Sequence, residues 1–234
     1  MGQTDEAMML AGALRSYLED LRETGIDELP LEMPLSPPVD RPDAPDVSSG
    51  PARETLEEIR ADIGDCRRCK LCEGRTHIVF GTGSAAARVL FVGEAPGRDE
   101  DLQGEPFVGE AGQLLTKMIA AMAFTRQEVY ICNVLKCRPP GNRNPDPEEI
   151  ALCSPFLRRQ VQAIAPQVII ALGTFAAQTL LASREPISRL RGKFHDYHGT
   201  PLMPTFHPSF LLRSPEKKRE AWSDLQQVMK FLVQ

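Results

Sequence analysis

Residues 89–97 read Val89-Leu90-Phe91-Val92-Gly93-Glu94-Ala95-Pro96-Gly97, a short apolar run that ends in a glycine-rich turn. A run that is apolar on both faces is typical of a parallel strand covered by helices on each side. Similar runs occupy residues 129–134 and 168–172, and each of the three runs is followed by a segment with helical periodicity. This alternation predicts an α/β fold with a parallel sheet.

A fourth strand is predicted over residues 202–206, and a closing helix over residues 216–232. Because Pro204 cannot donate to a strand ladder, we expect this strand at an edge of the sheet. The fold class is then a three-layer α/β/α sandwich with a central, mostly parallel four-stranded sheet. Ligands of such sheets bind at the carboxyl ends of the strands. Four predicted loops leave from that end, beginning at Gly93, Asn133, Gly173 and His207.

The composition is that of an ordinary globular protein, with 42% hydrophobic and 25% charged residues in a chain of 234. This length suits one full-sized core with an appendage. No apolar run approaches the roughly 18–20 residues of a membrane span, and the first seven residues lack the positive charge of a secretory signal. We therefore expect a cytoplasmic protein without a membrane partner; we also expect it to be a monomer.

The acidic residues are concentrated at the start of the chain. The net charge is -5, but residues 1–60 carry 14 Asp and Glu against 5 Arg, which leaves a balance of +4 for the remainder. A mildly basic body of this kind is compatible with a polyanionic partner, although many metabolic enzymes share the same balance.

The first 52 residues are predicted to form an acidic, flexible appendage. Apolar positions at helical spacing predict an amphipathic helix over residues 5–24. Residues 30–51 hold seven prolines and indicate an extended linker, with an ordered arm as the alternative. Thr55 and Glu58 have the spacing of a capping box, which marks a helix at the start of the body. We therefore divide the chain into residues 1–52 and a catalytic domain over residues 53–234.

Six cysteines in a chain without an export signal favour a metal site over disulfides; they stand at positions 66, 69, 72, 132, 137 and 153. The spacing of Cys66 and Cys69 lets two thiolates reach one metal, and Cys137 and Cys153 can complete a four-thiolate cage. Zinc and an iron–sulfur cluster both fit these residue types. Cys72 competes for the fourth place. Cys132 lies in a predicted buried strand, where a free cysteine is a small hydrophobe.

The glycine turn at residues 93–97 is a candidate ligand loop because its backbone N–H groups can point into the crevice. It lacks the GK[ST] ending of a Walker loop and does not match GxGxxG. The acidic residues that follow, at 99–101, would repel a dinucleotide pyrophosphate. The turn therefore indicates a different ligand.

Five blocks of the chain together resemble a known family. They occupy residues 93–101, 104–109, 133–140, 191–193 and 207–213. In these blocks, and in overall spacing from about Cys66 to the C-terminus, the chain is similar to the iron–sulfur uracil-DNA glycosylases, family 4 of that superfamily. The resemblance implies an enzyme that flips uracil out of single- or double-stranded DNA and hydrolyses its N-glycosidic bond. The product would be an abasic site, which begins base excision repair.

The same resemblance implies a [4Fe–4S] cluster held by four thiolates, those of Cys66, Cys69, Cys137 and Cys153. Cys72 and Cys132 fall at positions where the family pattern does not demand cysteine.

Each pocket residue has a role that its chemistry suggests. Phe107 can stack on the flipped base, and the Asn133 amide can pair with uracil O4 and N3–H but not with the opposite pattern of cytosine. His207, as a neutral imidazole, can donate to O2 while negative charge collects on the leaving base. The alternatives are a core phenylalanine, a buried Asn that caps its loop and a structural histidine.

A carboxylate can stabilise the cationic sugar or orient the attacking water, as in glycosidases. Glu94 is the first candidate, and Glu100 or Asp99 the second. The backbone of Ala95 is predicted to contact the base.

The segment Leu211-Leu212-Arg213 is predicted to grip the DNA. Leucine side chains would enter the gap left by the flipped base, and Arg213 would hold the phosphate backbone. Ordinary packing of both leucines is the alternative.

Two other functions are alternatives, and the sequence argues against the first of them. A branch of the superfamily bonds covalently to the product site through a histidine in an inserted loop, but the segment between Gly173 and Gly192 contains no histidine. A non-catalytic iron–sulfur module that binds nucleic acid is the second alternative. Its acidic N-terminal segment would contact a replication or repair protein.

Overall fold

The computed structural model describes residues 53–233. Contacts divide the chain into two units, Met1–Arg53 and Glu54–Gln234. The helix expected over residues 5–24 and the linker expected over residues 30–51 lie outside the described residues. The described helices and strands all belong to the second unit.

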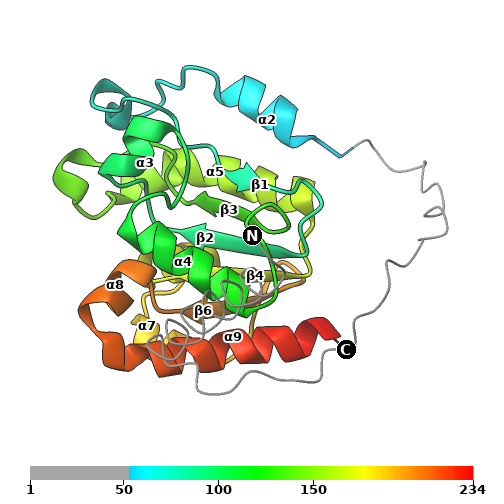
Figure 1. Ribbon diagram of the computed structural model, residues 1–234. Helices are drawn as coiled ribbons and strands as arrows, with labels where there is room; N and C mark the ends of the chain where they lie inside the picture. Colours follow the sequence, from blue (N-terminus) through cyan, green and yellow to red (C-terminus); the bar gives the residue numbers. More distant parts are fainter. Residues whose placement is uncertain (1–52, 234) are drawn as a thin grey trace, which may run out of the picture. The chain divides into compact units, whose positions relative to one another are not determined.

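The core of this unit is one sheet in the order β1-β3-β2-β4-β6-β5 (Figure 1). The strands are β1 (Thr82–Gly83), β2 (Val89–Gly93), β3 (Tyr130–Asn133), β4 (Val168–Leu172), β5 (His195–Tyr197) and β6 (Thr200–Thr205). Strands β3, β2, β4 and β6 are mutually parallel, whereas β1 and β5 are antiparallel to their neighbours. The predicted parallel sheet of four strands is confirmed, and a short antiparallel strand extends it on each side.

Contrary to the prediction, the proline-bearing strand β6 is not at the edge of the sheet, because β5 pairs with it. This pairing covers only Thr200 to Leu202, so Pro204 lies beyond the end of β5. On its other side Pro204 is opposite Ala171 of β4. Proline is therefore tolerated here because the strand has only one neighbour at that position.

Helices cover both faces of the sheet. They are α2 (Leu56–Ile63), α3 (Arg98–Gln103), α4 (Glu110–Ala121), α5 (Pro147–Ile164), α6 (Thr174–Leu181), α7 (Ile187–Leu190), α8 (Pro208–Arg213) and α9 (Lys218–Val233), with short 3-10 helices η1 (Lys70–Glu73), η2 (Pro140–Asn142) and η3 (Pro215–Lys217). The predicted capping box of α2 is present, since the Thr55 hydroxyl accepts from the Glu58 amide and the Glu58 carboxylate accepts from the Thr55 amide.

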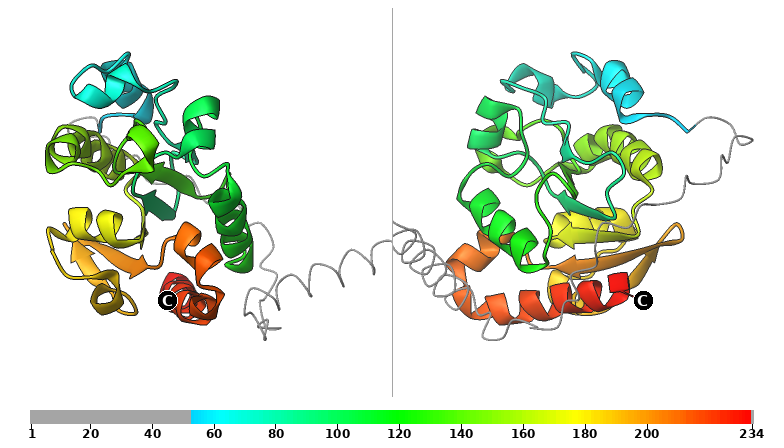
Figure 2. Two further views of the ribbon diagram at one scale, coloured as in Figure 1. Left: turned by 90° about the vertical axis from the view of Figure 1, so that its left-hand side faces the viewer. Right: turned by 45° about the vertical axis from the view of Figure 1, so that its right-hand side comes forward.

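The two helical layers follow from the alternation of side chains along each strand. Leu90 and Val92 of β2 pack with α2, α5 and α6 in one buried cluster. Val89 and Phe91 pack with α4 and α9 in the other. Figures 1 and 2 show these helices on the two sides of the sheet. The predicted three-layer sandwich is therefore confirmed.

No helix within residues 53–233 combines the length and the apolar character that crossing a bilayer demands.

Candidate active site

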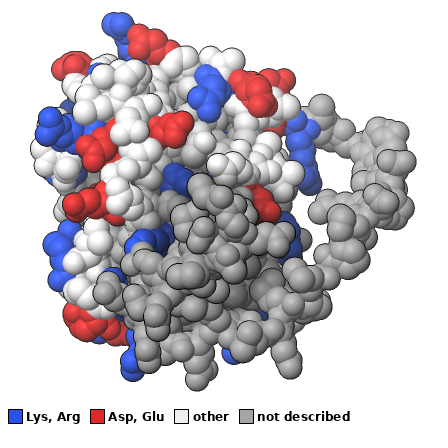
Figure 3. Space-filling model, in the orientation of Figure 1, with Lys and Arg blue, Asp and Glu red and all other residues white. Residues whose placement is uncertain are grey.

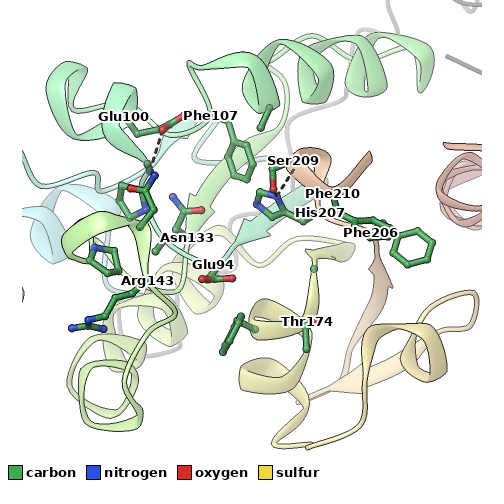
Figure 4. A pocket seen from close by; sticks show the side chains of 18 of the residues that line it. Glu94, Glu100, Phe107, Asn133, Arg143, Thr174, Phe206, His207, Ser209 and Phe210 are labelled. Carbon is green, nitrogen blue, oxygen red and sulfur yellow. Dashed lines mark hydrogen bonds between the residues drawn. The ribbon is translucent and has the colours of Figure 1, made fainter. Parts of the chain in front are cut away.

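A cavity of about 510 Å³ opens at the carboxyl ends of the four parallel strands. Its walls come from the loops after β2, β3, β4 and β6, the four loops that the sequence places at this end. Residues from all four loops line it, among them Glu94, Asn133, Gly173 and His207. In Figure 4 the ring of Phe107 lies on one side, Glu94 lies on the opposite side, and Asn133 and His207 lie between them. The sequence-predicted pocket residues therefore converge on one space.

Phe107 and Asn133 meet at Gly93, the last residue of β2. A Cβ atom at position 93 would lie 2.6 Å from Cζ of Phe107 and would also collide with Oδ1 of Asn133. Parallel pairing places Gly93 directly beside Asn133 at the end of β3. The absence of a side chain at position 93 therefore allows the ring and the amide to share one wall of the cavity.

Phe107 is held in an unusual backbone conformation, with φ of 55°. Such left-handed geometry is uncommon for a bulky residue and needs support from its surroundings. Glu100 supplies this support, because its Oε1 accepts from the amides of Val108 (2.9 Å) and Gly109 (3.2 Å). Its Oε2 accepts from the amide of Gly97 at 3.1 Å. Glu100 thus ties the loop of Phe107 to the glycine turn after β2.

The Asn133 side chain is 1% exposed, and its Oδ1 is a buried polar atom without a hydrogen-bond partner within the described part of the chain. An unsatisfied buried acceptor costs about 1–3 kcal/mol. Native proteins contain few such atoms, and a role in the function is one of the reasons for which they are retained. Since Asn133 lines the cavity, its amide oxygen is available to a donor that enters there.

The His207 ring is fixed in one tautomer by Ser209. The Ser209 amide donates to Nδ1 at 3.1 Å, and the Ser209 hydroxyl lies 2.8 Å from the same nitrogen. Nδ1 is therefore an acceptor, and in the neutral ring Nε2 carries the proton. Burial and the nearby Arg213 lower the pKa of His207 to about 4. Near neutral pH the ring is an uncharged donor through Nε2.

The Glu94 carboxylate lies in the cavity wall without a donor among the described residues. Burial raises its pKa to about 7. Glu94 can therefore exchange a proton near neutral pH, a property suited to a general base. Its neighbour Ala95 also lines the cavity and brings no polar side chain to it.

The two leucines after His207 have different environments, which corrects part of the prediction. Leu211 is 1% exposed and packs with Leu114, Phe206 and Ala221 in a buried cluster, so it does not reach the surface. Leu212 is 42% exposed. Arg213 is also exposed and lines the cavity. Of the predicted DNA-gripping residues, the structure therefore presents Leu212 and Arg213 to the surface and keeps Leu211 in the core.

Acidic and basic side chains are mixed on the face of the molecule drawn in Figure 3. Arg143, at the cavity wall, binds Glu149 with both amino groups at 2.6 and 2.9 Å. Arg213, which is exposed and lines the cavity, is a cation that can contact a polyanion there.

Cys66, Cys69, Cys137 and Cys153 each accept a hydrogen bond at sulfur; electrostatic interactions also link these cysteines to one another, and Cys69 to Cys72. Arg68 donates to Cys66 (3.4 Å), the amide of Leu71 to Cys69, Arg75 to Cys137 (3.5 Å) and the amide of Lys136 to Cys153 (3.3 Å). Burial raises the pKa of Cys137 to about 11, and the charges of Cys153 and Cys69 also act to raise it. Such crowding disfavours four free thiolates, whereas a bound cation stabilises them.

The chemistry of these thiols bears on which group they suit. Within residues 53–233, no group of three His, Cys, Asp or Glu side chains is arranged to hold a metal ion. Thiolates hold both structural zinc ions and iron–sulfur clusters, and hydrogen bonds to the sulfur atoms are a feature of cluster sites. The donor set and its N–H bonds are compatible with a cluster.

The remaining two cysteines differ from these four in their hydrogen bonds. No N–H group in the described part of the chain donates to the sulfur of Cys72 or Cys132. Cys132 is fully buried in β3, in agreement with its predicted place in the core.

Two site residues were missed or misjudged from the sequence. Ser209, which fixes the His207 tautomer, was missed. The sequence feature that could have predicted it is a serine two residues after a histidine at the start of a helix. Short polar side chains at such positions often form hydrogen bonds with the backbone and with neighbouring side chains. Glu100 was predicted as a second candidate carboxylate, but both of its oxygens bind backbone amides. The capping-box spacing from Gly97 to Glu100 is the signal for that role.

The fold and the site define an α/β/α sandwich whose pocket offers an aromatic face, an amide and a neutral imidazole to a planar heterocycle. Residues 80–226 match the model of the uracil DNA glycosylase superfamily. The type-4 uracil-DNA glycosylase of Archaeoglobus fulgidus is 45% identical over 75% of this chain and 92% of its own length. Its namesakes in Thermotoga maritima and Saccharolobus solfataricus are 44% and 39% identical over 77% and 76% of this chain, and over 96% and 87% of their own lengths. The chain belongs to the type-4 uracil-DNA glycosylases of this superfamily.

Proposed function

We propose that this protein excises uracil from DNA, by hydrolysis of the bond between uracil N1 and the sugar C1′. The observation that carries the proposal is the buried Asn133 Oδ1 without a donor among the described residues. Uracil supplies that donor through N3–H, and its O4 accepts from the amide nitrogen of the same side chain. Cytosine has an acceptor at N3 and a donor at C4, so the fixed amide rejects it.

The other pocket residues act on the flipped base. Phe107 stacks on the ring and offsets part of the few kcal/mol lost when the base leaves the duplex. His207 donates from Nε2 to uracil O2 while the electron pair of the breaking bond moves onto the base. Because the His207 pKa is about 4, the ring performs this as a hydrogen-bond donor and keeps its proton.

Glu94 is the carboxylate best placed to act on the sugar. As the C1′–N1 bond breaks, C1′ becomes cationic, and the Glu94 carboxylate stabilises it and accepts a proton from the attacking water. The water oxygen then bonds to C1′, and the uracil anion takes a proton from solvent. Glu100 instead positions Phe107, since both of its oxygens are engaged by backbone amides.

We also propose a [4Fe–4S] cluster on Cys66, Cys69, Cys137 and Cys153. Support comes from the N–H donors to the four sulfur atoms, which Cys72 lacks among the described residues, and from the electrostatic coupling of the thiols, which Cys72 shares through Cys69. When bound, the cluster would serve as a cross-link between the loop of residues 66–75, the loop after β3 and helix α5. We further propose that the enzyme acts in the cytoplasm, a location that fits a DNA repair enzyme.

The test uses an end-labelled oligonucleotide with a single uracil, treated with alkali after incubation to break any abasic site. We expect strand breakage at uracil and none in matched oligonucleotides with cytosine or thymine at that position. Asn133→Ala should lower the excision rate by about 100-fold or more, with little change in DNA binding. Binding without breakage by the unmodified protein would refute the proposal, and equal loss of binding and excision in the variant would make Asn133 structural.

A further inference from the structure

Lys136 is a lysine whose side chain lies inside the protein, 1% exposed. Its ammonium donates to the backbone carbonyl of Asn133 at 2.7 Å and to Oε1 of Gln160 at 2.6 Å. Gln160 is in turn fixed through its amide nitrogen, which donates to the Phe80 carbonyl at 2.9 Å. Neither the pocket nor the cysteine site includes this side chain, although it interacts with residues of both.

The ammonium lacks a carboxylate partner among the described residues, since both of its acceptors are neutral. Burial of a cation without a counter-charge is strongly unfavourable. The ionisable groups that interact with Lys136 are the thiols of Cys153 and Cys132, and its positive charge favours their thiolate forms. Its own backbone amide also donates to the Cys153 sulfur at 3.3 Å. Four thiolates at the cysteine site would provide the charge that the ammonium needs.

On its other side Lys136 restrains the residue that contacts the base. Asn133 is the last residue of β3, and the orientation of its backbone decides where its amide points. Lys136 fixes the Asn133 carbonyl, and the next amide, that of Val134, donates to the Gly93 carbonyl at 2.9 Å. The Asn133 amide has little room to move toward Gly93, since even a Cβ atom at that position would collide with its oxygen.

We propose that Lys136 positions the side-chain amide of Asn133, which contacts the base. We propose also that the positive charge of Lys136 acts on the cysteine site, so that one side chain connects this site with the Asn133 amide. The inference rests on the proposed function, because it assumes that Asn133 reads uracil. Removal of the ammonium should loosen the Asn133 amide and reduce the preference for uracil over cytosine. It should also remove a cation beside the cluster.

Lys136→Met is the informative variant, since methionine is an uncharged side chain of similar length. Gln160→Leu is its matched control, because it also breaks the bond between Lys136 and Gln160 but leaves the bond to Asn133. Lys136→Arg keeps the charge and the donors and should retain most of the preference. If Lys136→Met does not yield folded protein, Lys136→Gln replaces it with the same expected result.

The first measurement is binding of oligonucleotides that carry 2′-fluoro-2′-deoxyuridine or 2′-fluoro-2′-deoxycytidine, followed by fluorescence anisotropy. The fluorine slows cleavage, so binding is read without turnover. We expect the uracil-to-cytosine affinity ratio to fall about tenfold in Lys136→Met, as for loss of one well-placed hydrogen bond, and to stay within about twofold in Gln160→Leu. Both affinities come from one preparation, so the ratio does not depend on the folded fraction.

The second measurement is the reduction potential of the cluster by voltammetry. A nearby cation favours the reduced, more negative state, so Lys136→Met should lower the potential and Gln160→Leu should not. An unchanged potential would overturn the charge link. An unchanged affinity ratio, in a protein that prefers uracil, would overturn the positioning role while the proposed function stands. A protein without any preference for uracil would overturn both.

Discussion

Gly93 and Asn133 lie side by side at the ends of two parallel strands, so closely that a methyl group on Gly93 would collide with the amide oxygen of Asn133. The same methyl would lie 2.6 Å from Cζ of Phe107. The backbone of Gly93 and the side chains of Asn133 and Phe107 therefore form one wall of the pocket. Position 93, at the end of β2, is restricted to glycine.

The first prediction concerns this restriction. Gly93→Ala should lower uracil excision by about 100-fold or more, because the amide and the ring must both move away from their working positions. The control is Gly74→Ala, since a Cβ atom at position 74 would meet no atom within 4 Å. Single-turnover excision, measured for both variants, checks the prediction. Near-normal excision by Gly93→Ala would show that the pocket can rearrange.

The second prediction concerns the pH dependence of excision. Since burial raises the pKa of Glu94 to about 7, kcat/KM should rise through pH 7 as the carboxylate forms and then level off. His207 should add no step there, because its pKa is about 4 and the ring is neutral throughout. Rates between pH 5.5 and about 9 for the unmodified protein and Glu94→Gln test this. A step near pH 7 that persists in Glu94→Gln would assign it to another group.

Glu94 should also affect stability, with a sign that follows from its raised pKa. The folded state favours the protonated form, so the stabilisation is complete below the unfolded pKa near 4.5 and is lost as the pH rises through about 7. Glu94→Gln should therefore raise the melting temperature by a few degrees at about pH 8 and have little effect at about pH 4.5. An equal effect at both values would indicate a cause other than ionisation.

The third prediction separates two neighbouring leucines. Leu211→Ala should destabilise the fold by about 2–5 kcal/mol, because it empties a buried position. Leu212→Ala should change stability by about 0.5 kcal/mol or less and should slow excision from duplex DNA more than from single strands, since only the duplex leaves a gap to fill. Urea unfolding and single-turnover excision on both substrates test the pair. Equal slowing on both substrates would argue against a wedge at Leu212.

The fourth prediction concerns the cysteines. Cys153→Ser should lose most of its iron and its visible absorption, whereas Cys72→Ser should keep both, because only the Cys153 sulfur of the two accepts an N–H bond. Iron per protein and the absorption spectrum are the measurements. The reverse result would make Cys72 the fourth ligand.

The sequence predicted the parts of the fold that have a strong hydrophobic signal. Four parallel strands and the longer helices could be predicted because their apolar residues form continuous runs or repeat at helical spacing. Strands β1 and β5 have two and three residues, and neither is fully buried, so no periodic pattern marks them. Helices α3, α7 and α8 have six residues or fewer, too short for a clear helical repeat.

The pocket could be predicted in its members but not in its details. Phe107, Asn133, His207 and Glu94 were named because they belong to the loops, and to the sequence blocks, that gather at one end of the sheet. The division between Leu211 and Leu212 depends on the rotation of α8, and the clamp at Glu100 depends on how two loops approach each other. Both are tertiary relationships, which local spacing does not encode.

The outer strands of the sheet have a final consequence. Both β1 and β5 are very short, so few backbone groups are left open at either side. A long open strand can act as a template on which another copy adds its own strand and begins to aggregate. Copies of this protein that bind neighbouring sites on DNA therefore have little open strand edge through which to associate with one another.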